Sequence, residues 1–434
     1  MKNSKEENIF KLDGKVPLRK AVPVGLQHVL AMFVSNITPI VILANVCGLD
    51  KTLSAHLIQN AMIIAGLGTL IQLCPIWKFG SGLPMVMGIS FTFLNCAISI
   101  GTKYGIETVI GSVIVGGLVI ALLGLFAKYW LHLISPVVAA TVVTAIGFSL
   151  LSVGANSFAG GVGAADFGSA KNWIIGAVTL ISCLVFSLVT KGYLKVISVL
   201  FGLVVGYILS ICLGVVDFSI LKESDLLALP VILPFKPSFN LSAIISITII
   251  YLVSATENIG DSTALAETGL ERPIEQKELA GSLAADGLVS SIAGIFGCTP
   301  ITSFSQNVGL VAMTKVVNRF TIGTGAVIMI VAGLFPFFGA ALQTVPSAVL
   351  GGCTIMMFGM IVVSGIKMIG KCGFSARNML IVSLSLSVGL GFTQVSAMFK
   401  IFPELIQIVF AENCVSVVFL IAFILNLTLP KNME

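Results

Sequence analysis

Charged residues are scarce in this chain of 434 residues: only 10% are Asp, Glu, Lys or Arg, whereas 57% are hydrophobic. Ordinary soluble proteins carry roughly 25% charged residues, so the composition excludes a soluble globular protein. Apolar runs of about 20 residues, the length needed to cross a ~30 Å hydrocarbon core, recur along the whole sequence. The composition therefore predicts an all-α polytopic protein of the lipid bilayer, with no soluble domain.

Paired cysteines are also missing. The nine cysteines are scattered through apolar runs without a Cys-x-x-Cys pair, so neither a disulfide framework nor a metal site is expected. The first twenty residues lack the apolar core and cleavage site of a signal peptide, and six of them are Lys or Arg. We therefore expect an uncleaved first helix and, by the positive-inside rule, a cytoplasmic amino terminus.

Fourteen transmembrane spans are predicted from the apolar runs. They lie near 21–45, 54–74, 84–100, 107–126, 133–154, 173–189, 196–216, 242–266, 281–297, 303–318, 321–341, 346–366, 379–397 and 406–428. With the amino terminus inside, 18 of the 24 Lys and Arg residues fall in cytoplasmic segments. A wrongly added or missing span would erase that bias. The chain is thus expected to be a multi-pass protein of the cell membrane with both termini cytoplasmic.

The third and tenth spans are interrupted at matching positions. Pro84 and Gly88 break the third, Pro300 breaks the tenth, and each contains a Ser-Phe-hydroxyl triplet, at 90–92 and 303–305. Two halves of seven spans must be inverted relative to each other, which is a common transporter plan, and matching interruptions indicate a binding site near the membrane midplane. We expect short extended strands there, leading into two half-helices whose amino termini converge.

Three acidic residues fall inside predicted spans: Glu257, Asp261 and Asp286. Intramembrane carboxylates are costly and indicate function. Glu257 and Asp261 are four residues apart, so they share one face of a helix, and both should not ionise easily in a low dielectric. Such a pair suits proton-coupled transport, whereas Asp286 fits a structural brace as well as a proton relay. His28 is also predicted to lie in a span, where a lone histidine is more often a core residue.

The segment QNVGLVAMTK, residues 306–315, resembles the signature of the nucleobase–ascorbate transporter family, also called nucleobase–cation symporter 2. Gln306, Asn307, Gly309, Thr314 and Lys315 match that signature in full. The resemblance extends over nearly the whole chain. Further segments that carry it are Gln27–His28, Ser135–Leu151, the Glu257 and Asp261 spacing, and Ala285–Gly287.

The resemblance implies two groups of site residues. The residues implied at the substrate are Ser90, Phe91, Glu257, Gln306, Asn307 and Gly309. The residues implied in proton coupling are His28, Asp261 and Asp286. Glu257 would accept hydrogen bonds from ring N–H groups and Gln306 would bind the base through both atoms of its amide. Phe91 would supply a stacking ring. The proton would be the coupling ion, without any other cofactor.

The resemblance also implies a division into two moving parts. After a cytoplasmic tail at 1–20, a core domain would comprise 21–130 and 241–342, and a gate domain 131–240 and 343–434. Family members usually form homodimers. The expected partners are a small nucleobase, the bilayer and a second copy of the chain, and nucleic acid is not expected.

With Gln306 at the first signature position, the chain resembles the xanthine and uric acid branch of the family, and Asp261 fits that branch too. We therefore expect a proton-coupled purine nucleobase symporter, with a uracil or broad-specificity nucleobase symporter as the alternative. The polar Asn36 and Thr38 in the first span depart from the family pattern.

Three other classes are less compatible with the residues. A sulfate or bicarbonate carrier should offer a cation to its anion. An intramembrane protease, the enzyme alternative, normally takes its two acids from different helices. A channel would not need buried amides on broken helices.

Overall fold

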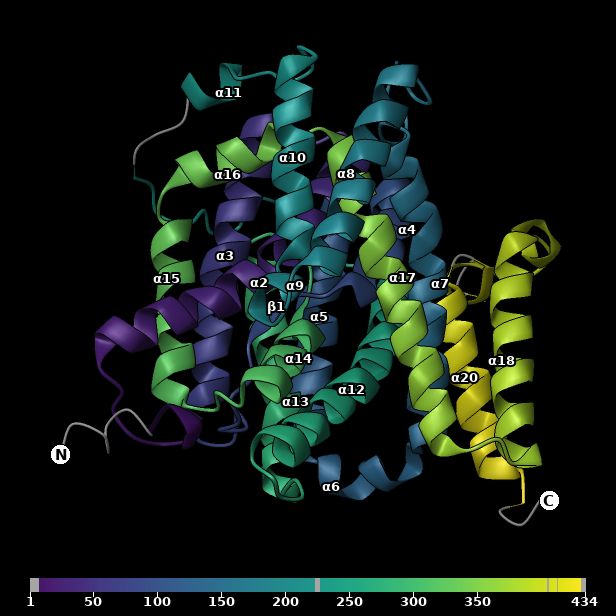
Figure 1. Ribbon diagram of the computed structural model, residues 1–434. Coiled ribbons are helices and arrows are strands. Elements are labelled where there is room, and N and C mark those ends of the chain that lie inside the picture. Colours follow the sequence, from purple (N-terminus) through teal and green to yellow (C-terminus); the bar gives the residue numbers. More distant parts are fainter. Residues whose placement is uncertain (1–7, 223–226, 404–405, 412, 431–434) are drawn as a thin grey trace.

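The computed structural model describes residues 8–222, 227–403, 406–411 and 413–430, and this part of the chain is predominantly helical (Figure 1). Its elements in chain order are η1 (Asn8–Phe10), α2 (Leu18–Val46), α3 (Lys51–Leu73), β1 (Met87–Ile89), η2 (Phe91–Phe93), α4 (Leu94–Tyr104), α5 (Ile106–Leu125), α6 (Ala127–Trp130), η3 (Leu131–Leu133), α7 (Pro136–Phe158), α8 (Ala170–Val189), α9 (Tyr193–Val196), α10 (Ser198–Cys212), α11 (Ser219–Lys222), α12 (Leu241–Gly269), α13 (Gln276–Ile295), β2 (Ile301–Ser303), α14 (Ser305–Thr314), α15 (Arg319–Gly333), α16 (Pro336–Gln343), α17 (Ser347–Cys372), α18 (Ala376–Gln394), η4 (Ser396–Phe399), η5 (Gln407–Ala411) and α20 (Cys414–Thr428).

Eight of the described helices are long and apolar enough to cross a membrane, or nine if α15 and α16 are counted as one span. Those two helices meet at an angle of 80°, where the sequence predicts a straight span over 321–341. Pro336 is the first residue of α16, and Phe335 before it is extended. The residue before a proline is driven out of the helical region, so the chain bends at this point.

Two peripheral helices expose apolar side chains to the surroundings. Leu184 and Leu188 on α8 are 50% and 74% exposed, and Leu380 and Leu384 on α18 are about half exposed. Helix α18 lies at the edge of the molecule in Figure 1. Exposed leucines on helices of this length are expected at a lipid interface, and the protein is an integral membrane protein.

The helices pack in a small number of close pairs. In one group α5 packs against α12 and α13, and α3 packs against α15. In another, α7 packs against α17, α8 against α10, and α18 against α20. Gly287 makes the α5–α13 approach possible, because a Cβ atom there would lie only 2.2 Å from the backbone nitrogen of Ala121.

The two strands form a small antiparallel sheet inside the first group of helices. Met87 pairs with Ser303, Gly88 with Thr302 and Ile89 with Ile301. All six residues are buried. A side chain on Gly88 would collide with Met32, Phe304 and Asn36, so only glycine fits this strand without movement.

Candidate functional site

The site is organised by the crossing of β1 and β2, each of which leads directly into a half-helix. β1 runs through the 3₁₀ turn Phe91–Phe93 into α4, and β2 runs into α14. The crossing is extended by two backbone hydrogen bonds of 3.0 Å, from Ser90 N to Pro300 O and from Phe304 N to Val86 O. The first N–H groups of a helix have no partner within that helix and carry partial positive charge. The crossing therefore presents two sets of backbone donors within the protein interior.

The two carboxylates of α12 reach the two different half-helices. Glu257 is half-buried and accepts a hydrogen bond from Thr92 Oγ1 at 2.9 Å, at the start of the first half-helix. Asp261 accepts from Ser303 Oγ at 3.1 Å and Ser305 Oγ at 2.9 Å, at the start of the second. One face of α12 thus joins both ends of the crossing through hydroxyl groups.

Asp286 lies behind β2, in a buried polar network on α13. Its Oδ2 atom accepts from Asn258 Nδ2 at 2.8 Å and from the Ser303 backbone N–H at 3.4 Å. Its Oδ1 atom accepts from Gln72 Nε2 at 3.3 Å. Ser282 joins the same network, since Asn258 Nδ2 lies 3.0 Å from its hydroxyl oxygen. Asp286 therefore holds the strand that precedes the second half-helix.

His28 on α2 and Asn307 on α14 are joined directly. Asn307 Nδ2 lies 3.2 Å from His28 Nδ1 and donates to His28 O at the same distance. His28 Nε2 and Asn307 Oδ1 are buried, and within the described residues neither has a hydrogen-bond partner. Buried polar atoms of native proteins normally find a partner, so each of these two atoms has the capacity to bind a polar solute or a water molecule.

The other predicted site residues lie around the two helix starts. Gln306 is half-buried in the first turn of α14, and Gly309 is exposed, with nothing within 4 Å of where its Cβ would be. Ser90 caps the first half-helix by accepting from Thr92 N at 3.3 Å. The ring of Phe91 packs edge-on against Phe358 of α17, with 5.1 Å between centroids.

The signature segment has two ends with different contacts. Gln306 and Asn307 stand at the crossing, whereas Lys315 ends α14 with a left-handed φ of 59° and donates from Nζ to Thr268 O at 2.7 Å. Thr268 lies in the last turn of α12. Lys315 thus ties the far end of the half-helix to the helix that carries the two carboxylates.

Several site residues were not found by sequence reasoning. Asn36 accepts a 2.7 Å hydrogen bond from the Ile89 backbone N–H, which explains the polar residue in the first span. Thr92, Gln72, Asn258 and Ser282 were also missed. Asn258 stands between Glu257 and Asp261, and an amide between two intramembrane acids is a signal that could have identified it.

Comparison with known proteins places this arrangement in a family. A model of the Permease family, Xan_ur_permease, matches residues 19–398. The chain belongs to this family. It is the nucleobase–ascorbate transporter family whose signature stands at 306–315. Its members are permeases, so the protein is a transporter and not an enzyme.

Two relatives align with this permease over most of their length. It is 36% identical over 438 residues to the xanthine permease XanQ of Escherichia coli K12, covering 97% of this chain and 94% of the relative. It is 37% identical over 379 residues to the uric acid permease PucK of Bacillus subtilis 168, covering 87% and 88%.

Solved structures with little sequence identity share the fold of this permease. The transmembrane domain of the cyanobacterial bicarbonate transporter BicA superimposes with a TM-score of 0.60 at 15% identity, covering 80% of this chain and 94% of that one. The murine anion transporter Slc26a9 in its inward-facing state gives 0.59 at 13% identity, covering 93% and 69%. At this identity the likeness concerns the fold alone.

Proposed function

We propose that this permease is a proton-coupled symporter that imports xanthine or uric acid across the cell membrane. The relatives named for these two purines share 36% and 37% identity with it. The observation that carries the proposal is the position of Glu257 and Gln306. Glu257 is hydrogen-bonded at the start of one half-helix, and Gln306 occupies the first turn of the other.

The chemistry of these residues suits an oxopurine. The Glu257 carboxylate accepts from ring N–H groups, and the Gln306 amide both donates and accepts, which matches a neighbouring C=O and N–H pair. Phe91 offers a ring face or edge for stacking. Ser90 contributes backbone contacts, and Asn307 and Gly309 give the site its shape.

Proton coupling is proposed to use Asp261 and Asp286, with His28 supporting the polarity of the site. Asp261 binds the hydroxyls of Ser303 and Ser305. A proton gained or lost there changes the hydrogen bonds at the start of α14, next to Gln306. Base binding and protonation would therefore be linked through one short stretch of chain.

We propose that the fold is a seven-plus-seven inverted repeat of fourteen spans, and the helix pairs support it. An inverted repeat relates each span to the span seven positions later. Under that relation the packed pair α5–α13 corresponds to the packed pair α15–α3, and α8–α10 corresponds to α18–α20. The α7–α17 pair maps onto itself. A core domain (21–130, 241–342) would then move against a gate domain (131–240, 343–434) for alternating access, in a homodimer with cytoplasmic termini.

Uptake into proteoliposomes tests the proposed function. Radiolabelled xanthine should accumulate under an inward proton gradient, and a protonophore should abolish accumulation. Unlabelled xanthine or uric acid should compete. If uracil competes best, the alternative of a uracil or broad-specificity symporter replaces the purine assignment; if no base accumulates, the proposed function is wrong.

A further inference from the structure

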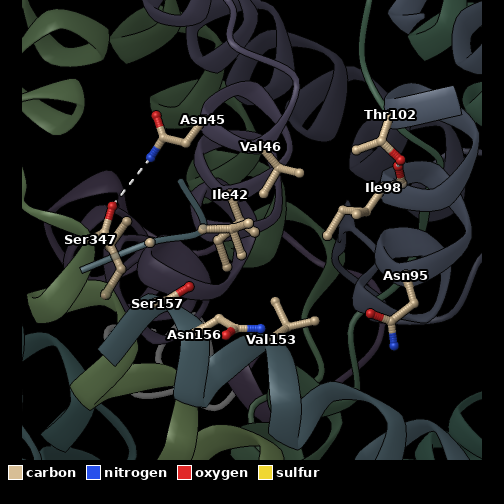
Figure 2. A pocket seen from close by; sticks show the side chains of 13 residues that line it. Ile42, Asn45, Val46, Asn95, Ile98, Thr102, Val153, Asn156, Ser157 and Ser347 are labelled. Atoms are coloured by element: carbon tan, nitrogen blue, oxygen red, sulfur yellow. Dashed lines mark hydrogen bonds between the residues drawn. The ribbon is translucent and has the colours of Figure 1, made fainter. Parts of the chain in front are cut away.

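A cavity of about 230 Å³ lies away from the strand crossing, among the ends of four helices (Figure 2). It is bounded by the last turns of α2 and α7, by α4 and by the first turn of α17. None of the predicted substrate residues lines it. It nevertheless adjoins the site, because Asn95 in its wall belongs to the first turn of α4, directly after the 3₁₀ turn that holds Thr92, which binds Glu257.

The wall of the cavity is mainly apolar, and the polar residues among its lining are uncharged. Its polar residues are Asn45, Asn95, Thr102, Asn156, Ser157 and Ser347. In Figure 2, Asn45 and Ser347 lie on one side of the cavity, Asn95 and Thr102 on the opposite side, and Asn156 between them. The remaining lining side chains are aliphatic, and among the residues that the structure describes no Lys, Arg, Asp or Glu contributes. Apolar walls with a few convergent polar groups are typical of small-molecule sites.

This chemistry selects the class of ligand. An anion would require a cationic partner, and the described lining residues include none. The carboxamide of Asn156 carries donors and an acceptor in one plane, so it matches a neighbouring N–H and C=O pair of a neutral lactam ring. Aliphatic walls suit the faces of such a ring.

The cavity also lies on the boundary between the two proposed domains. Asn45 and Asn95 belong to the proposed core, and Ser149 and Ser347 to the proposed gate. Across this boundary Asn95 Nδ2 donates to Ser149 O at 2.9 Å, and Asn45 Nδ2 donates to Ser347 Oγ at 3.5 Å. In the proposed topology this end of the molecule faces the outside, so an imported solute would pass here first.

We infer that this cavity is an outer capture site for an uncharged nucleobase, which holds the base in front of the Glu257 and Gln306 site. This inference rests on the proposed function and adds a second site to it. Capture precedes transfer, so the outer site raises the concentration of base at the inner one without contacting Glu257.

Cysteine protection tests the capture site. Asn156 is exposed, so an Asn156→Cys variant in proteoliposomes should react with a membrane-impermeant maleimide. Saturating xanthine should slow this labelling several-fold, and should still do so when Glu257→Gln disables the inner site. The matched control is Ala155→Cys, since Ala155 is exposed on the same turn but does not line the cavity. Its labelling should not change.

Two results would overturn the inference. Protection that disappears with Glu257→Gln would show that the base acts only from the inner site, through a conformational change. Equal protection of Ala155→Cys would show a general change in accessibility. Neither result affects the proposed function, which fails only if the unsubstituted protein neither binds nor accumulates any base.

Discussion

Among single residues, Glu257 is expected to contribute the most to binding of the base at the proposed site. Glu257→Gln keeps the shape of the side chain but replaces one acceptor oxygen with a donor. Losing a hydrogen bond that involves a charged group costs about 1.5–3 kcal/mol, equivalent to about 10- to 150-fold in affinity. We expect xanthine uptake to fall at least by such a factor. Glu267→Gln is the control, because Glu267 lies on the same helix and is exposed; equal loss in both variants would contradict the role of Glu257.

A substitution at Gln306 tests recognition of the base separately from proton coupling. Gln306→Glu removes the amide donor and places a negative charge next to Ser305, whose hydroxyl binds Asp261. Xanthine uptake should weaken roughly tenfold, the loss of one hydrogen bond of about 1.4 kcal/mol. Competition by uracil should increase. Gln394→Glu adds the same charge at the exposed end of α18 and should change neither quantity. An unchanged competition profile in Gln306→Glu would exclude Gln306 from base recognition.

Among the elements, the α5–α13 contact is the most sensitive to an added methyl group. In Gly287→Ala the new Cβ would lie 2.2 Å from Ala121 N and 2.6 Å from Gly117 O, both backbone atoms that cannot rotate away. Overpacking of this kind costs typically 1–3 kcal/mol. The melting temperature of the solubilised protein should therefore fall. Gly359→Ala on α17 is the matched control, since its Cβ would meet nothing within 4 Å. Its stability should stay the same or rise, because Ala favours helix by about 1 kcal/mol over Gly.

The elements also show how far the sequence could predict the fold. Eight of the expected spans coincide with described helices that are long and apolar enough to cross a membrane, because long apolar runs and their charged ends are local properties. The interruptions were visible because Pro84 and Pro300 cannot continue a helix. The bend before Pro336 was overlooked, since its apolar neighbours fit a straight span equally well.

The sequence alone does not predict which distant segments of the chain pair with each other. Residues far apart in the chain come together here. Gly88 pairs with Thr302 between the two strands, and Gln72 and Asn258 both donate hydrogen bonds to Asp286. A buried amide in an apolar run shows that a polar partner exists without showing which one. The acids and the signature could therefore be assigned to a site, but the network that holds them could not.

On the scale of the whole molecule, the decisive question is whether the proposed core moves against the proposed gate. Asn45 and Ser347 belong to different proposed domains, and their side chains lie 3.5 Å apart. In Asn45→Cys with Ser347→Cys, a short bis-methanethiosulfonate, which attaches to each thiol through a disulfide, should join α2 to α17 and abolish uptake. A reductant cleaves those disulfides and should restore uptake. Ala21→Cys with Thr324→Cys is the control within the core, where Thr324 Oγ1 lies 3.0 Å from Ala21 O. That link should leave uptake intact. Full transport by the linked Asn45 and Ser347 variant would contradict rigid-body movement at this boundary, because a joined pair cannot separate to admit a base.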